Sequence, residues 1–303
     1  MGLNAANEGF LDGFVRHADV DTLVAHTRSR EEFAAFGEIV GEARGTGFPL
    51  ARIAPGDNAA LGRVGALLHP FPGFGPLAWN RRFGDSRAYS LLGITHTTAT
   101  HAVMDSIGNL LVAPVEPWDA VVCTSTAVRR TYEGVLSHWE EYLVSRLGAT
   151  RLPRPELPII PLGVDTAKFA AGAAAEAARA RLRGRLGIGE GDIVVLWMGR
   201  FNHAAKAHPI PACLALESLA RQVPARIVHL QAGWFADADM ENSFKDAARV
   251  FAPGVHQVFV DGRQPDVRRD VWTAADIFMS LSDNLQETFG LTPIEAMAAG
   301  LPV

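Results

Sequence analysis

Short apolar runs of strand length alternate with amphipathic stretches of helical length along most of the chain. In the first half, the runs that read as strands cover residues 21–26, 48–53, 65–69, 90–95 and 119–124. Segment 31–43 repeats its apolar side chains at helical spacing, and Ser125 suits the N-cap of a long helix that extends to about Arg146. In the second half, strands are predicted at 157–162, 193–198, 225–231, 257–260 and 275–281, and helices at 209–221, 243–250 and 266–273. This alternation is typical of parallel sheets covered by helices, so we predict an α/β protein.

The same pattern predicts two domains, 1–165 and 166–303, each built on one doubly wound sheet. The Ala- and Arg-rich segment 170–185 is expected to be a solvated helix at their joint. Residues 1–13, rich in Gly, Asn and Ala, are predicted as a loop that runs into a helix at 10–17. No apolar run precedes this loop, and the chain stops at Val303, just where a further strand is expected to start. We therefore expect the first strand to be missing and the second domain to be truncated.

Segment 69–76 is dense in glycine and proline and leads into Trp79, Arg81, Arg82 and Phe83. Glycine and proline at this density oppose regular structure, so the sequence predicts a surface loop across 69–83. Its rings would stack on the face of a sugar with the arginines near an anion, or would pack the loop onto the core. We favour packing onto the core.

Composition and charge narrow the function. Of the 303 residues, 48% are hydrophobic and 20% charged, as in a soluble globular protein. The net charge of −5 argues against a nucleic-acid partner, which usually requires a basic excess. Cys123 and Cys213 lie far apart and form no metal-binding motif, and no apolar run reaches transmembrane length. Together with the absence of a signal-peptide pattern, this predicts a cytoplasmic protein.

The stretch 282–300 carries the first candidate chemistry, because it reads as a strand end, a turn and a helix start. Free backbone N–H groups at such a helix start bind anions well. Thr292 suits the N-cap, Pro293 the first helical position and Gly300 the C-cap. Glu295, three residues after Thr292, would then complete a capping box, or it would be a ligand-binding carboxylate; the pattern leaves both open. Glu287 in the turn is a functional candidate, against the alternative of an ordinary solvated carboxylate.

Two cations follow the first strand of the second domain. Arg200 and Lys206 share the loop that begins at Gly199, and the ends of parallel strands in such a sheet face a common edge. Two fixed cations near a helix N-terminus suit a diphosphate. The alternative is that they are two unrelated surface cations, which would give the same sequence pattern. In the first domain, His96 stands at the end of a strand, where ligands bind. His101 more readily caps or lines the helix that follows, and no third ligand makes the two histidines a metal site.

Together these residues resemble family 4 of the retaining glycosyltransferases, which have the GT-B fold. The resemblance rests on Arg200-x5-Lys206 followed by Glu287-x7-Glu295, with Phe289-Gly290 between the glutamates and Ala296-Met297-Ala298 after them. Segment 160–165, Ile-Pro-Leu-Gly-Val-Asp, is similar to the stretch by which that family leaves its first domain. The resemblance implies two Rossmann-like domains that face a cleft.

The resemblance also implies residue roles. Arg200 and Lys206 would hold the nucleotide diphosphate and stabilise its charge as the glycosidic bond breaks. Glu287 would bind hydroxyls of the donor sugar, Glu295 would accept the ribose hydroxyls, and His96 would lie near the transferred sugar. The remaining donor contacts would come from Gly199, Phe289 and the backbone N–H groups of Gly290, Leu291 and Thr292.

The implied function is transfer of a hexose-type sugar from a nucleotide-sugar donor to a glycan, glycolipid or small acceptor, with retention at the anomeric carbon. No cofactor and no metal ion is expected, because Arg200 and Lys206 supply the positive charge. A sugar or lipid-linked acceptor leaves open a peripheral contact with the inner face of a membrane. The alternatives are a nucleotide-sugar epimerase of the same fold and a non-catalytic nucleotide-sugar-binding protein. A dehydrogenase is disfavoured, because no Gly-x-Gly-x-x-Gly follows any predicted strand.

Overall fold

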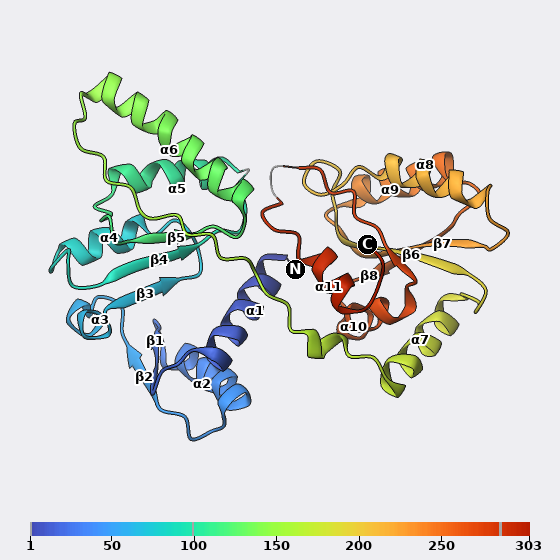
Figure 1. The fold of residues 1–303 in the computed structure, drawn as a ribbon, viewed down its shortest axis with the longest axis horizontal. Coiled ribbons are helices and arrows are strands. Elements are labelled where there is room, and N and C mark those ends of the chain that lie inside the picture. Colours follow the sequence, from blue (N-terminus) through green and yellow to red (C-terminus); the bar gives the residue numbers. More distant parts are fainter. Residues whose placement is uncertain (1, 99, 285–286) are drawn as a thin grey trace. The chain divides into compact units, whose positions relative to one another are not determined.

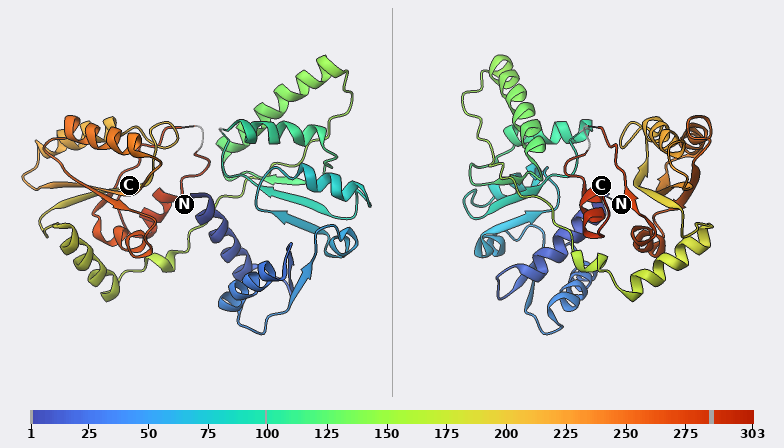
Figure 2. Two further views of the ribbon diagram at one scale, coloured as in Figure 1. Left: turned by 180° about the vertical axis from the view of Figure 1, so that it is seen from behind. Right: turned by 45° about the vertical axis from the view of Figure 1, so that its right-hand side comes forward.

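The computed structural model describes residues 2–98, 100–284 and 287–303 (Figure 1). The chain divides into an N-terminal unit, Leu3–Gly163, and a C-terminal unit that contains Val164–Val303. Each unit is described by itself below, and Figure 2 gives two further views of both.

The N-terminal unit alternates helices and strands. Its elements in chain order are α1 (Gly2–His17), β1 (Leu23–His26), α2 (Arg30–Arg44), β2 (Leu50–Ile53), α3 (Asn58–Val64), β3 (Ala66–His69), α4 (Gly75–Arg82), β4 (Ser90–Ile94), α5 (His101–Val112), β5 (Ala120–Val122) and α6 (Thr126–Leu147). All the pairings are parallel, as predicted, but they form two sheets, β1-β2 and β3-β4-β5, where one was expected. No ladder pair joins the two sheets within the described ranges.

Local sequence signals fix several helix starts in this unit. The hydroxyl of Ser125 accepts a hydrogen bond from the N–H of Val128, so the predicted cap of α6 is confirmed. Thr100 caps α5 in the same way, which makes His101 the first residue of that helix rather than its cap. Helices α5 and α6 cover one face of β3-β4-β5 (Figure 1). Between helices and sheet lies a core whose most deeply buried members include Leu91, Ile107, Tyr132 and Leu136.

The predicted surface loop at 69–83 is wrong for its second half, which forms α4. Pro76 fits the first turn of that helix, where a missing N–H costs nothing. Arg81 is fully buried, because its guanidinium donates to both carboxylate oxygens of Asp119 at 2.6 and 2.7 Å. Phe74 is buried, whereas Trp79 remains 47% exposed and Phe83 87% exposed. Packing onto the core therefore describes Phe74 but not the two later rings.

Two other predictions for this unit are wrong in part. Residues 2–13, predicted as a loop, belong to α1, whose hydrophobic side chains include the fully buried Val15. The predicted strand at 157–162 is reduced to two isolated bridges, Ala120↔Glu156 and Cys123↔Ile159, beside β5. Backbone hydrogen bonds still join the two segments, from Val121 N–H to the Glu156 carbonyl and from Cys123 N–H to the Pro158 carbonyl, both at 2.8 Å.

The C-terminal unit is built on one four-stranded parallel sheet in the order β8-β7-β6-β9. Its elements are the 3-10 helix η1 (Thr166–Phe169), α7 (Ala173–Leu186), β6 (Ile193–Phe201), α8 (Pro209–Ala220), β7 (Ile227–Phe235), α9 (Ala238–Phe251), β8 (His256–Asp261), α10 (Pro265–Ala274), β9 (Ile277–Phe278) and α11 (Leu291–Ala298). The central strands β6 and β7 each run nine residues and pair along their full length.

Helices cover both faces of this sheet, so the doubly wound prediction is confirmed for this unit. Successive residues of β6 alternate between the faces: Val194 packs among residues of α7, α10 and α11, and Val195 among residues of α8 and α9. Strand β9 covers only two of the seven residues predicted at 275–281. Its Phe278 N–H donates to the carbonyl of Pro302, so the residues after α11 return beside β9.

Candidate functional site

The first part of the site follows the carboxyl end of β6, which carries Gly199 and Arg200. Beyond Phe201 the chain turns sharply, because the side-chain oxygen of Asn202 accepts hydrogen bonds from the N–H groups of Ala204 and Ala205 at 3.0 and 2.7 Å. The carbonyl of Asn202 accepts from the N–H of Lys206 at 2.9 Å. This turn fixes where the lysine leaves the sheet edge.

Lys206 and Glu287 meet although 81 residues separate them. The lysine Nζ donates to Glu287 Oε2 at 2.6 Å, and the side chains are 32% and 28% exposed. A second contact joins the two segments, because the amide of Asn284 donates to the backbone carbonyl of Lys206 at 2.8 Å. The structure thus brings together two of the residues predicted from sequence, in a half-buried charge pair that solvent and ligand can reach.

Helix α11 begins directly after this pair, but not where predicted. Its N-cap is Gly290, with φ 83° and ψ 68°, so Thr292 and Pro293 stand at the second and third helical positions. The left-handed φ favours glycine, because a Cβ there adds strain. Pro293 has no N–H, so the unpaired donors of the first turn come from Leu291 and Thr292. With the positive end of the helix dipole, they are suited to bind an anion.

The C-terminal end of α11 agrees with the prediction. Gly300 adopts φ 76°, and the N–H groups of Gly300 and Leu301 donate to the carbonyls of Met297 and Ala296. This is the Schellman pattern, which ends a helix on a left-handed glycine.

Glu295 does not form the capping box, because Thr292 is not the N-cap and no side-chain cap is made. Its carboxylate is half-buried and makes no hydrogen bond or ion pair with the described residues. Burial raises the pKa of Glu295, and the positive charge of Arg268 opposes this only in part. A half-buried carboxylate that no cap explains is suited to accept hydrogen bonds from a ligand.

The remaining donor-binding candidates line the same region of the unit. Phe289 is half-buried and immediately precedes the N-cap of α11. Gly199 pairs in register with Gly233 of β7, where a Cβ would lie only 1.9 Å from the carbonyl oxygen of Gly199. Gly233 therefore needs to be glycine, because the backbone of Gly199 approaches it closely, whereas a Cβ on Gly199 would meet only the ring of Trp197 at 3.2 Å.

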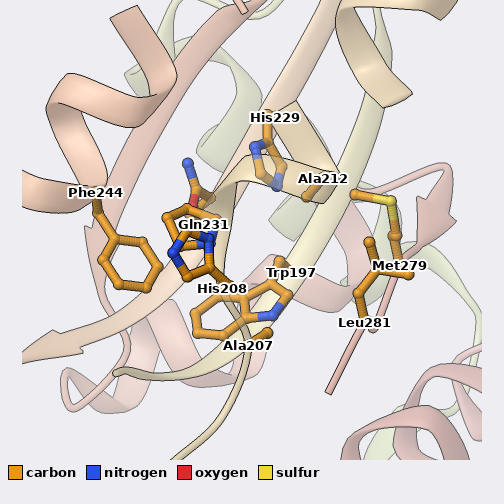
Figure 3. Close-up of a pocket in the computed structure, with 10 residues that line it drawn as sticks. Trp197, Ala207, His208, Ala212, His229, Gln231, Phe244, Met279 and Leu281 are labelled. Atoms are coloured by element: carbon orange, nitrogen blue, oxygen red, sulfur yellow. The ribbon is translucent and has the colours of Figure 1, made fainter. Parts of the chain in front are cut away.

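A small cavity lies behind the Lys206 loop (Figure 3). It has a volume of about 20 Å³ and is lined by Trp197, Ala207, His208, Pro209, Ala212, His229, Gln231, Phe244, Met279 and Leu281. Burial lowers the pKa of His229 to about 4, so its ring is neutral at pH 7. Its Nδ1 lies 3.1 Å from the side-chain oxygen of Gln257, and its buried Nε2 has no partner among the described residues. The space is too small for a ligand larger than a water molecule.

His96 belongs to the N-terminal unit, two residues after β4. Its Nε2 lies 2.6 Å from the carbonyl of Pro70, and because a carbonyl only accepts, this nitrogen carries the proton. Burial lowers the pKa of His96, and the hydrogen bond to Pro70 opposes the shift. The ring of Phe71 packs edge-on against His96 at 5.9 Å and also contacts His69 at 5.7 Å. His96 is thus a neutral, oriented imidazole at a strand end.

Sequence reasoning missed the two asparagines that shape the site, Asn202 and Asn284. Asn202 had a usable signal, because Asn just after a strand is a frequent turn former. Asn284 had none, since its partner is a backbone carbonyl 78 residues away. Within the described residues, no cluster of three or more His, Cys, Asp or Glu side chains could hold a metal ion. No helix in the described ranges combines the length and the apolar character that crossing a membrane requires.

The chain has the GT-B fold, in which an α/β unit with parallel strands is followed by a doubly wound C-terminal unit. Solved structures with this fold agree. Anabaena HepE, in complex with UDP and glucose, aligns with 98% of this chain and 76% of its own at a TM-score of 0.60 and 14% identity. Trehalose 6-phosphate synthase from Burkholderia multivorans aligns with 90% of this chain and 60% of its own, at a TM-score of 0.52 and 14% identity.

Residues 178–303, within the C-terminal unit, match the family described as "Glycosyl transferases group 1". A curated relative is the alpha-monoglucosyldiacylglycerol synthase of Streptococcus pneumoniae, 27% identical over 185 residues, or 61% of this chain. The match covers only 36% of that relative's length. The finer assignment to family 4 stays a prediction.

Proposed function

We propose that this protein is a retaining glycosyltransferase that moves a hexose-type sugar from a nucleoside-diphosphate sugar to a hydroxyl of a glycan, glycolipid or small acceptor. The observation that carries the proposal is the 2.6 Å contact between Lys206 and Glu287, three residues before the N-cap of α11. A cation, a carboxylate and a set of unpaired N–H donors are the groups that a diphosphate joined to a sugar requires.

Each group has a distinct task in this proposal. Lys206 and Arg200, with the N–H groups of Leu291 and Thr292, neutralise the charge that develops on the diphosphate as its bond to the sugar breaks. Glu287 accepts hydrogen bonds from sugar hydroxyls, and Glu295 accepts them from the ribose. Fixed donors and cations in a partly dry site stabilise such charge better than water does.

The chemical step needs no separate carboxylate pair. As the bond between the anomeric carbon and the phosphate oxygen breaks, the acceptor hydroxyl oxygen bonds to that carbon on the same face. The proton of the hydroxyl passes to the departing phosphate oxygen, so charge and atoms balance and the configuration is retained. The neutral imidazole of His96 is proposed to contact the transferred sugar. We further propose that the protein works in the cytoplasm and reaches lipid-linked acceptors at the inner membrane face.

Two relatives support the choice of substrates to test. HepE is described in complex with UDP and glucose, and the pneumococcal relative is named for a glucosylated diacylglycerol. UDP-glucose is therefore the first donor to try, beside GDP- and ADP-sugars. Diacylglycerol, a monoglucosylated lipid and short oligosaccharides are the first acceptors.

The test is a transfer assay on the full-length protein. We expect nucleoside diphosphate to be released only when an acceptor is present, and NMR of the product to show the anomeric configuration of the donor. Release without acceptor and with an altered sugar would indicate an epimerase. Donor binding by calorimetry, without transfer to any acceptor, would refute the transferase in favour of a binding protein.

A further inference from the structure

An open hollow of about 290 Å³ lies on the N-terminal unit, lined by Gly65, Arg87, Ala88, Tyr89, Ser90 and Trp118. Gly65 precedes β3, Ser90 begins β4 and Trp118 stands two residues before β5, so the hollow sits at the amino edge of that sheet. His96 follows the carboxyl end of β4, at the opposite edge. The volume approaches the lower end of the range for small-molecule sites, roughly 300 Å³.

Trp118 forms an exposed but rigidly held wall of this hollow. The next residue, Asp119, is fully buried and accepts hydrogen bonds from Arg81 and from the N–H groups of Leu91 and Glu116. A further bond, from the N–H of Asp119 to the carbonyl of Glu116, closes the turn that carries the tryptophan. The indole nevertheless stays 41% exposed. An aromatic ring on a fixed backbone loses little freedom when a ligand covers it.

Arg87 supplies the polar side of the hollow. Its backbone N–H is anchored by Asp85 at 2.9 Å, while its exposed guanidinium has no ion pair or hydrogen bond within the described part of the chain. By contrast, Arg81, six residues earlier, uses its guanidinium entirely inside the protein. Because Arg87 lines the hollow and its guanidinium has no partner among the described residues, its N–H groups can donate to a molecule bound there. The hydroxyl of Ser90 adds a donor and acceptor at the same place.

We propose that this hollow is a saccharide-binding site, separate from the residues assigned to the transfer reaction. A pyranose offers an apolar C–H face that can cover the Trp118 indole, and equatorial hydroxyls that can bond to Arg87 and Ser90. A simple anion would not need the indole, and an apolar ligand would leave the guanidinium and the hydroxyl unpaired. The site would hold a glycan chain on the protein, and it does not depend on which donor the transfer reaction uses.

The experiment is a calorimetric titration of the full-length protein with maltotriose, cellotriose and an N-acetylglucosamine trimer, each to about 10 mM, since exposed sites of this kind bind in the millimolar range. A parallel arm uses vesicles that contain a glucosylated diacylglycerol. Binding of a soluble trisaccharide assigns the site to free glycan, and binding of the vesicles alone assigns it to a glycolipid headgroup. The variants are Trp118→Ala and Arg87→Gln, with Trp79→Ala as the matched control, because Trp79 is similarly exposed in the same unit but does not line the hollow.

We expect Trp118→Ala to weaken saccharide binding at least ~10-fold and Arg87→Gln to weaken it less, while Trp79→Ala leaves it unchanged. Arg87→Gln also covers the case in which Trp118→Ala fails to fold, because Arg87 is an exposed residue with no internal partner. Absence of saccharide and vesicle binding overturns the inference. The inference is also overturned if saccharide binding is unchanged in both Trp118→Ala and Arg87→Gln, or if Trp79→Ala weakens it to the same extent. If the wild-type protein binds saccharide in the hollow but transfers no sugar in the assay, the result counts against the proposed transferase and not against this site.

Discussion

Replacing Lys206 by alanine separates a role in folding from a role in catalysis. The Lys206–Glu287 pair joins Nζ and Oε2 at 2.6 Å, but both side chains remain about one-third exposed. A pair screened to that extent contributes about 0.5–1 kcal/mol to the free energy of unfolding. The melting temperature of the variant should therefore fall by about 2–4 °C at most.

The effect on transfer should be much larger. If Lys206 stabilises the departing diphosphate, its removal costs about 3 kcal/mol of transition-state stabilisation, a loss of kcat/KM of at least ~100-fold. Glu287→Ala should cause a loss of similar size. The assay measures initial rates of nucleoside diphosphate release with donor and acceptor present, on protein shown by circular dichroism to be folded at the assay temperature.

Lys245→Ala is the matched control, because Lys245 pairs with Glu241 on α9 at the same 2.6 Å. This variant should lose a comparable fraction of stability and keep its full transfer rate. A loss below about fivefold for Lys206→Ala, or an equal loss in both variants, would refute the assignment of Lys206 to the diphosphate.

Three further changes test other parts of the structure. Arg81→Met should lower the free energy of unfolding by about 3–5 kcal/mol, because it leaves the carboxylate of Asp119 buried without its cation. Denaturant unfolding measures this loss, and Arg82→Met is the control because Arg82 is exposed. Gly290→Ala should cost about 1–2 kcal/mol of stability through its φ of 83° and raise the KM for the donor, because the N-terminus of α11 shifts; an unchanged KM would argue against phosphate binding there. Glu295→Gln should weaken donor binding without destabilising the fold. Because burial raises the folded-state pKa of Glu295 above 4.5, its contribution to stability is present below pH 4.5 and is lost as pH rises through the folded-state pKa. The stability of the Gln variant should therefore gain on that of wild type across this window, and parallel melting curves would contradict the shift.

Much of the fold follows from local pattern, because period and capping residues act within a few positions. Ser125 capped α6 where expected, and β6, β7 and β8 of the C-terminal unit overlap their predicted ranges. The failures have non-local causes. Helix α4 is stabilised by the Arg81–Asp119 pair across 38 residues, which overrides the glycine and proline before it. The strand predicted at 157–162 is held beside β5 by bridges to Ala120 and Cys123, more than 30 residues earlier in the chain, and so local pattern could not fix its extent.

The sequence predicted which residues belong to the candidate site better than it predicted how they are arranged. The spacing of Arg200 from Lys206, and of Glu287 from Glu295, selected residues of which Lys206 and Glu287 are in contact. The Thr292 capping box was a plausible local signal, but the N-cap is Gly290. The left-handed conformation of this glycine lets the chain enter the helix two residues earlier. The clamp between Asn284 and the Lys206 carbonyl could not be predicted, since no local rule relates them.

The contact between Lys206 and Glu287 also bears on how the nucleoside diphosphate product is released from the site. In the structure each of these charges is balanced by the other. An intact donor can satisfy both at once, with phosphate for the lysine and hydroxyls for the glutamate. A nucleoside diphosphate that has lost its sugar occupies the lysine and leaves the half-buried Glu287 without a counter-ion, which is unfavourable. If the proposed function is right, Glu287 competes with the nucleoside diphosphate product for Lys206. Re-formation of the Lys206–Glu287 pair then favours product release before the next donor binds.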